Sequence, residues 1–146
     1  MTTEPLQGQE KYEYVQGMFG RIAQTYDLVN MLMTGGQDRA WRRFVIRQAQ
    51  LEPGDAVLDI ASGTGDIAFE AAKSVPGVEA IGADFSLPMM QVGQQRPMGG
   101  RINWAGADAM NLPFDDNTFD AVTAGYLLRN VPDIPRTLTE IYRVLK

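Results

Sequence analysis

The sequence predicts an α/β protein in which helices cover a parallel sheet of four strands. Apolar runs alternate along the chain with segments of helical periodicity. The run from Ala56 to Ile60 is rich in apolar and β-branched residues, which is typical of a strand buried on both faces. A turn containing Gly63 and Gly65 follows it directly, as at the strand-to-helix junction of nucleotide-binding folds.

Two helices are expected before the first strand. Apolar residues recur at helical spacing between Val15 and Tyr26, which predicts a helix that either covers the ligand site or packs on the core. A second helix near Gln37 to Gln50 ends before the turn Leu51-Glu52-Pro53-Gly54. The start of the chain is polar, so we expect residues 1–13 to be flexible and residues 14–146 to form one folded domain.

After the first strand, strands and helices alternate. We expect strands at residues 56–60, 78–83, 102–107 and 119–124, and helices at residues 66–74, 88–95 and 134–145. Such an order places the fourth strand beside the first and the ligand site at the carboxyl ends of the strands.

The glycine turn predicts a ligand-binding loop. Gly63 and Gly65 can adopt backbone angles closed to other residues and let a ligand approach the main chain. N–H groups at the start of the following helix, from Asp66, would point at that ligand. The sequence Gly63 to Ala68 also satisfies a loose dinucleotide fingerprint, so an NAD-binding module remains an alternative here.

Three acidic residues stand at the tips of successive predicted strands, Asp59 just inside the first strand and Asp84 and Asp108 after the next two. Asp59 can orient the turn or reach a cationic group of a ligand, and it would repel a pyrophosphate, which favours a cofactor without phosphates. Asp84 stands where a carboxylate can accept both ribose hydroxyls. We expect Asp108 to accept from an adenine amino group while the Ala109 amide donates to a ring nitrogen.

Composition excludes several classes of protein. The net charge of −5 argues against a general nucleic-acid binder, although four arginines between Arg39 and Arg47 form a local basic patch, which we interpret as a solvated helix face. Without cysteine or histidine the chain has no disulfide, and zinc sites and histidine-based triads are not expected. No apolar run is long enough to span a membrane, and we expect a cytoplasmic protein.

The phrases V-L-D-x-A-x-G-T-G-D, G-A-D-F-S-x-x-M-M and A-D-A-x-x-L-P-F resemble those of class I S-adenosylmethionine-dependent methyltransferases. The resemblance implies a Rossmann-like sheet and S-adenosylmethionine as the cofactor. The predicted cofactor site then comprises Asp59, Ala61, Gly63, Thr64, Gly65, Asp84, Phe85, Asp108, Ala109 and Gly125.

More narrowly, the segment Phe19 to Asn30, the segment Gly36 to Arg43 and the triplet Arg129-Asn130-Val131 resemble the ubiquinone/menaquinone biosynthesis C-methyltransferases. The resemblance implies C-methylation of a polyprenyl hydroquinone such as demethylmenaquinol, with peripheral membrane association. Arg129 would stabilise a phenolate electrostatically with Asn130 beside it, and Tyr26 would close the site.

Two residues depart from this family's pattern. Asp38 stands where members commonly have His, and Gly125 stands where they commonly have Ser. We expect either change to retune the pocket. Gly125 would then contact the cofactor only through its backbone.

The resemblance also bears on the end of the chain. In the family the phrase Tyr142 to Lys146 is followed by Pro-Gly-Gly and a fifth strand, so we expect an incomplete sheet whose fourth strand is an exposed edge. Self-association or a partner would cover that edge. Three alternatives remain open at this point: a quinol C-methyltransferase, a non-catalytic S-adenosylmethionine-binding module, and an NAD-dependent oxidoreductase.

Overall fold

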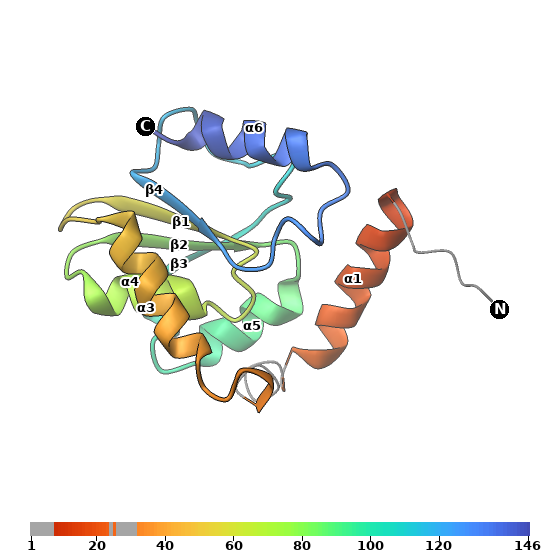
Figure 1. The fold of residues 1–146 in the computed structure, drawn as a ribbon, viewed down its shortest axis with the longest axis horizontal. Helices are drawn as coiled ribbons and strands as arrows, with labels where there is room; N and C mark the ends of the chain where they lie inside the picture. Colours follow the sequence, from red (N-terminus) through yellow and green to blue (C-terminus); the bar gives the residue numbers. More distant parts are fainter. Residues whose placement is uncertain (1–7, 24, 26–31) are drawn as a thin grey trace.

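A computed structural model describes residues 8–23, 25 and 32–146 of the chain. Its centre is a parallel sheet in the order β3-β2-β1-β4, as the sequence predicts. The strands are β1 (Ala56–Ile60), β2 (Glu79–Asp84), β3 (Asn103–Gly106) and β4 (Ala121–Ala124). All four therefore present their carboxyl ends at the same edge of the sheet (Figure 1).

Strand β1 lies in the middle of the sheet. Leu58 pairs with Ile81 of β2 on one side and with Val122 of β4 on the other. Every residue of β1 after Ala56 is buried, as expected for a strand covered on both faces. Val57 and Leu58 point into separate apolar cores, one on each face of the sheet.

Helices cover both faces of the sheet. Helices α3 (Asp38–Ala49), α4 (Asp66–Ser74) and α5 (Leu87–Gln95) lie on one face, and α6 (Ile134–Val144) lies on the other (Figure 1). The first core contains Ile46 of α3 and Phe69 of α4, and the second contains Val144 of α6. A short 3₁₀ turn, η1 (Gly99–Arg101), connects α5 to β3.

Helix α1 (Gly8–Ile22) packs against α5, with Gly20 next to Pro88. It begins six residues before the expected domain boundary at residue 14, so the segment 8–13 that we expected to be flexible is helical. It ends at Ile22, earlier than the predicted end at Tyr26: Ala23 and Thr25 lie in a turn, with the Thr25 N–H donating to the Ile22 carbonyl at 3.0 Å, and Tyr26 lies outside the described residues. No helix within the described ranges is long and apolar enough to cross a membrane.

The fourth strand is shorter than predicted. Phe119 forms only an isolated bridge with Leu145, and the ladder with β1 begins at Ala121. The Phe119 backbone is bonded to the end of α6 and the residues after it, since its N–H donates to the Val144 carbonyl and its carbonyl accepts the Lys146 N–H, each at 2.9 Å. Asp120 bonds to Ala56 with its N–H donating to the Ala56 carbonyl and its carboxylate accepting the Ala56 N–H, each at 2.8 Å.

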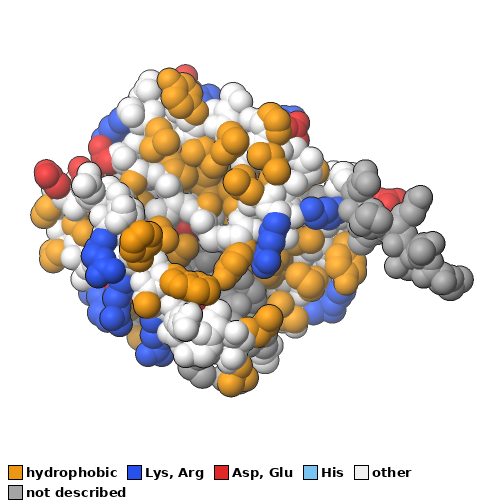
Figure 2. Space-filling model, in the orientation of Figure 1, with side chains coloured by type: hydrophobic (Ala, Val, Ile, Leu, Met, Phe, Trp, Pro, Cys, Tyr) orange, Lys and Arg blue, Asp and Glu red, His pale blue; other side chains and the backbone are white. Residues whose placement is uncertain are grey.

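The free edge of β4 opens onto an apolar face. A groove of Ala124, Leu128, Leu138 and Ile141 runs between the end of this strand and α6. Figure 2 shows apolar side chains gathered in this part of the molecule. Leu138 and Tyr142 of α6 are exposed there by 49% and 83%.

Candidate functional site

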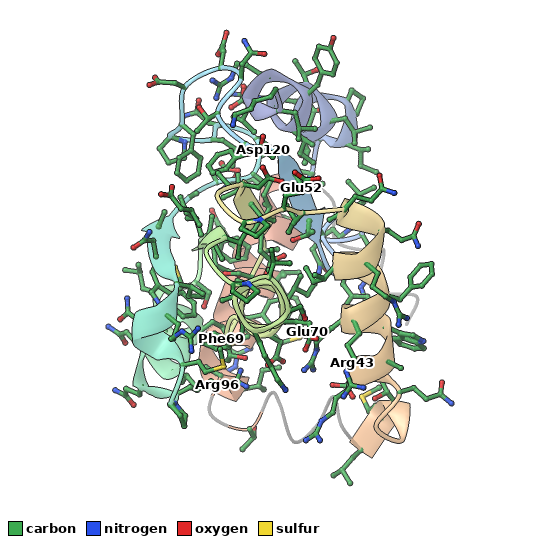
Figure 3. The ribbon with its side chains drawn as sticks, turned by 90° about the vertical axis from the view of Figure 1, so that its left-hand side faces the viewer. Arg43, Glu52, Phe69, Glu70, Arg96 and Asp120 are labelled. Carbon is green, nitrogen blue, oxygen red and sulfur yellow. The ribbon has the colours of Figure 1, made fainter. Side chains whose placement is uncertain are left out.

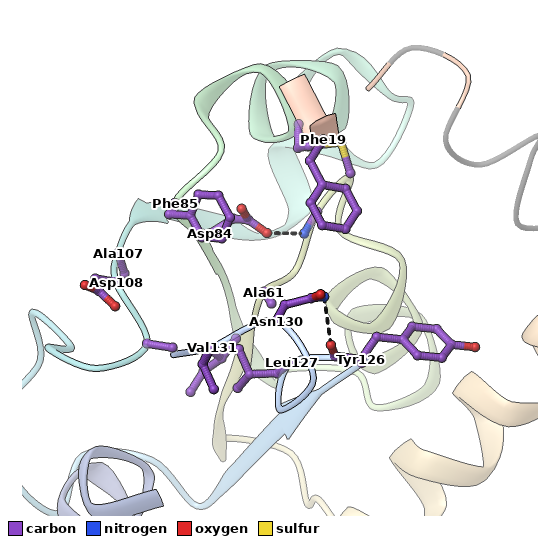
Figure 4. Close-up of a pocket in the computed structure, with 15 residues that line it drawn as sticks. Phe19, Ala61, Asp84, Phe85, Ala107, Asp108, Tyr126, Leu127, Asn130 and Val131 are labelled. Carbon is purple, nitrogen blue, oxygen red and sulfur yellow. Dashed lines mark hydrogen bonds between the residues drawn. The ribbon is translucent and has the colours of Figure 1, made fainter. Parts of the chain in front are cut away.

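A cavity lies at the carboxyl ends of the strands, where the predicted site residues converge (Figure 4). We call it the strand-end cavity. It is narrow, about 50 Å³, and loops from all four strands contribute to it. Its predicted members are Ala61, Gly63, Asp84, Phe85, Asp108, Ala109, Gly125 and Asn130.

Asp84 fastens the glycine turn to the end of β2. Its Oδ2 accepts the Gly63 N–H at 2.8 Å, and its Oδ1 accepts the Ser86 N–H at 2.7 Å. Burial raises the pKa of the Asp84 carboxyl, and the hydrogen bonds from Ser86 and Gly63 oppose that rise. Each oxygen can accept a further hydrogen bond, so Asp84 still has acceptor capacity for a ligand.

The turn requires backbone angles that favour glycine. Gly63 and Gly65 have φ of 57° and 93°. Gly65 does not line the strand-end cavity, nor the second cavity that is described below. A Cβ on Gly65 would lie 2.6 Å from the Trp104 ring. Close packing of the turn therefore leaves no room for a side chain at this position.

The charge of the strand-end cavity is negative. Asp84 and Asp108 contribute carboxylates, and no lysine or arginine appears among the described residues that line it. Asp108 Oδ1 accepts the Met110 N–H at 2.8 Å, which orients the carboxylate at the end of β3. A cavity of this charge suits a ligand carrying positive charge and disfavours a pyrophosphate.

A second cavity, of about 510 Å³, lies between α3 and the carboxyl ends of β1 and β4. We call it the α3 cavity. Apolar side chains of Trp41, Val45, Ile67 and Tyr126 form much of its wall. The two cavities share Ala61, Gly125 and Tyr126, so only the ends of β1 and β4 separate them.

Asp59 lies in the wall of the α3 cavity, and the strand-end cavity does not include it. It is 1% exposed, and Thr123 Oγ1 donates to its Oδ1 at 2.8 Å. Burial raises the pKa of Asp59 to about 7, against the Thr123 hydrogen bond and with help from the charges of Asp84 and Asp66. A nearby cation would favour its ionised form.

The α3 cavity also contains unpaired polar atoms. Ser62 Oγ and Asp38 Oδ1 are buried without a hydrogen-bond partner, and both residues line this cavity. Buried polar groups are usually paired, so these atoms point to a ligand that would satisfy them. Thr64, another predicted cofactor residue, lies in the same wall.

The described residues that we predicted to be catalytic do not lie in the same cavity. Asn130 lines the strand-end cavity, and its Nδ2 donates to the Tyr126 carbonyl at 3.0 Å (Figure 4). Arg129 lines the groove beside α6 and neither cavity, and its guanidinium lies 4.6 Å from the Tyr126 ring centroid. Tyr26 lies outside the described residues.

The structure adds residues that the sequence reasoning did not select. Phe19 of α1 and Met89 of α5 line the strand-end cavity, and Tyr126 lines both cavities. Met89 was visible in the phrase that follows Asp84, and Phe19 opens a segment that resembles the family. Tyr126 is marked only by its backbone, which the sequence does not reveal: its φ of 59° lies in the left-handed region.

Comparisons with known proteins identify the family of the chain. The model of the ubiE/COQ5 methyltransferase family matches residues 7–146. A demethylmenaquinone methyltransferase of Symbiobacterium thermophilum is 46% identical over 98% of this chain and 59% of its own length. A ubiquinone/menaquinone biosynthesis C-methyltransferase UbiE of Desulfotalea psychrophila is 52% identical over 90% of this chain and 54% of its own. The chain thus spans little more than half of these relatives.

A solved structure from Methanococcus maripaludis, described as an S-adenosyl-L-methionine-dependent methyltransferase, has the same fold. It aligns with a TM-score of 0.76 and 20% identity, over 100% of this chain and 64% of the other. This likeness confirms the predicted Rossmann-like class I methyltransferase fold.

Proposed function

The chain belongs to the ubiE/COQ5 methyltransferase family, and from that premise we propose that the protein methylates a ring carbon of demethylmenaquinol or a related polyprenyl hydroquinone. S-adenosylmethionine would be the methyl donor. The observation that carries the proposal is the pair of strand-end carboxylates, Asp84 and Asp108, in a cavity whose described lining has no cationic side chain. The carboxyl ends of the strands are where open parallel sheets bind their ligands.

The residues present fit this cofactor. Asp84 has acceptor capacity for ribose hydroxyls, and Asp108 with Ala109 would hold the adenine. The carboxyl of Asp59 would face the positive charge of the ligand across the end of β1. When bound, S-adenosylmethionine supplies an electrophilic methyl group, so the chain's main task is to orient donor and acceptor.

The α3 cavity is our candidate for the acceptor. Trp41, Val45, Ile67 and Tyr126 offer an apolar wall to an aromatic ring, and the shared residues Gly125 and Tyr126 adjoin the cofactor cavity. Methylation at carbon is favoured when the acceptor's phenol loses its proton.

Polar residues near Tyr126 would support that proton loss. Asn130 is placed to touch a ligand in the strand-end cavity. Arg129 would stabilise the phenolate only through Tyr126, on which it stacks, so we propose it as a positioning residue. Tyr26 stays a proposal that rests on the resemblance alone.

We further propose a cytoplasmic protein that works at the membrane surface, where the tail of the acceptor would remain. Leu32 and Met33, just before α3, are 69% and 81% exposed, and Arg39, Arg43 and Arg47 are exposed on that helix. Cations beside exposed apolar side chains are typical of interfacial segments. The protein is expected to co-sediment with anionic vesicles and not with neutral ones; equal recovery with both would contradict this proposal.

The comparisons do not favour the alternative of a non-catalytic S-adenosylmethionine-binding module, because the relatives are named as methyltransferases. We also propose that a second copy or a partner covers the apolar groove beside β4.

Titration calorimetry of the 146-residue chain with S-adenosylmethionine and NAD tests the cofactor. We expect the first to bind and the second not to bind; the opposite result would overturn the proposal. Incubation with S-adenosylmethionine and a short-tailed demethylmenaquinol, followed by mass spectrometry, tests the reaction. Binding without a methylated product would select the non-catalytic module.

A further inference from the structure

Two arginines from different helices hold the first residue of α4. Asp66 Oδ1 lies 2.6 Å from Arg96 Nη1, and Asp66 Oδ2 lies 2.9 Å from Arg42 Nη2. Arg42 belongs to α3, where it also pairs with Asp38, and Arg96 is the C-cap of α5. The three side chains are 15% to 32% exposed, so these ion pairs are less screened by water than surface pairs.

Arg96 also contacts the glycine turn directly. Its Nη1 donates to the Thr64 carbonyl at 3.2 Å, and its guanidinium lies 4.9 Å from the Phe69 ring centroid. Figure 3 shows Arg96 next to Phe69. One side chain therefore connects the turn, the start of α4 and the end of α5.

Close packing reinforces this contact. A Cβ on Gly93 of α5 would lie 2.7 Å from the Thr64 carbonyl oxygen and would clash with the Trp104 ring. The backbone of α5 therefore lies directly against the turn. Any shift of the turn must be accommodated by α5 or by the side chain of Arg96.

The turn has few other side-chain anchors. Gly65, the N-cap of α4, has no side chain to cap the helix, and both Asp66 oxygens are paired with arginines. On the opposite side Gly63 is held by Asp84. The backbone also holds the turn, since the Ser62 N–H donates to the Ala83 carbonyl at 3.1 Å. Among the side chains, Asp84 and Arg96 bond to the turn directly, and Arg42 acts through Asp66.

We propose that Arg96 and Arg42, acting through Asp66, are positioning residues that fix the turn from Ser62 to Gly65 for cofactor binding. This inference rests on the function proposed above. Charge-assisted hydrogen bonds in a partly buried place are strong enough to order a short turn before the ligand arrives. Without them, binding the cofactor would have to order the turn itself.

The four arginines of the basic patch between Arg39 and Arg47 do not all have the same surroundings in the structure. Arg42 faces α4 and is committed to Asp66 and Asp38, while Arg39, Arg43 and Arg47 are exposed. Only the exposed members fit the interpretation of a solvated helix face. Arg42 is the member that the cofactor turn needs.

Amide hydrogen exchange by NMR on the ligand-free chain tests the positioning itself. In Arg96→Gln the amides of Gly63 and Gly65 should exchange at least about tenfold faster, while those of β1 stay unchanged. Arg42→Gln should give a smaller change in the same direction, and Arg96→Lys should restore part of the protection. Arg101→Gln, which removes an exposed charge from η1, is the matched control and should change nothing.

Calorimetry on the same variants tests the link to the cofactor. Arg96→Gln should raise the Kd for S-adenosylmethionine about tenfold, and Arg101→Gln should leave it unchanged. A lower Tm with unchanged exchange in the turn would overturn the proposal, because the arginines would then be merely structural. Faster exchange with an unchanged Kd would overturn the role in cofactor binding. If the unaltered chain does not bind S-adenosylmethionine, the proposed function fails, and the exchange experiment still decides the positioning.

Discussion

Among single residues, Asp84 is the one whose substitution should weaken cofactor binding most clearly. It holds Gly63 and Ser86 with two oxygens that an amide cannot fully replace, since the amide nitrogen donates and does not accept. We expect Asp84→Asn to raise the Kd for S-adenosylmethionine by at least about tenfold. Titration calorimetry measures this, with circular dichroism to confirm folding.

The control for Asp84 is Asp115→Asn, which alters an exposed carboxylate that lines neither cavity. It should bind S-adenosylmethionine like the unaltered chain. If folded Asp84→Asn also binds normally, Asp84 does not belong to the cofactor site.

Asp59 makes stability depend on pH. Its pKa is raised from 3.8 to about 7 in the folded chain, so the unfolded chain ionises first as the pH rises. As the pH rises from 3.8 to about 7, the free energy of unfolding should therefore decrease, and it should stay low at higher pH. Asp59 should account for up to about 4 kcal/mol of this decrease. Asp84, whose pKa is also raised, contributes with the same sign.

We expect Asp59→Asn to flatten this dependence and to raise Tm above neutral pH. The amide oxygen can still accept from Thr123, so the core is disturbed little. Thermal unfolding followed across the acid-to-neutral range measures the slope. The exposed variant Asp115→Asn should keep the original slope, and an unchanged slope in Asp59→Asn would contradict the assigned cause.

Among the elements, α5 packs against the glycine turn so closely that no side chain fits at Gly93. Gly93→Ala would place a methyl group against the Thr64 carbonyl and the Trp104 ring. The ring is fixed in place, because its Nε1 donates to the Gly99 carbonyl at 2.9 Å. Overpacking of this kind should lower the free energy of unfolding by about 1–3 kcal/mol. Chemical denaturation measures the change.

Gly17→Ala in α1 is a matched helical control. Its nearest neighbour would be the flexible end of Arg21 at 3.7 Å, so the substitution should be neutral or stabilise by up to about 1 kcal/mol. Equal destabilisation by the two substitutions would show that α5 has room at Gly93.

Most elements could be predicted because their signals are local. The apolar run of β1 and the segment Asp66–Ser74 have the predicted bounds, since a strand buried on both faces and a helix after a glycine turn are visible in sequence spacing. The end of α1 and the start of β4 were less predictable. The Phe119 backbone bonds to Val144 and Lys146, which are distant in sequence, and does not join the ladder with β1.

At the scale of the whole molecule, the sheet has an apolar face beside its edge strand. Leu138 and Tyr142 of α6 are exposed next to the groove that β4 borders. Burying such a face is favourable, and an unpaired strand edge adds hydrogen-bonding groups to the same surface. We therefore expect the chain to self-associate in solution.

Size-exclusion chromatography with light scattering measures that association. The expected mass exceeds the 16.1 kDa of one chain, and Leu138→Lys with Tyr142→Lys should shift it toward that value. Lys73→Gln, an exposed change on α4, should have no effect. A stable, folded monomer of the unaltered chain would contradict self-association through this face.

The sequence by itself determined the glycine turn and the strand-end acids, because each depends on spacing along a short stretch of chain. It also placed the fourth strand beside the first, because strands and helices that alternate in this way follow a common topology. Only the tertiary structure decided how the site divides. It assigned Asp59 to the α3 cavity, Arg129 to a neighbouring groove, and Asp66 to arginines from α3 and α5. Arg96 lies 30 residues from Asp66, and ion pairs across such a separation form only when packing brings helices together, which no local pattern records.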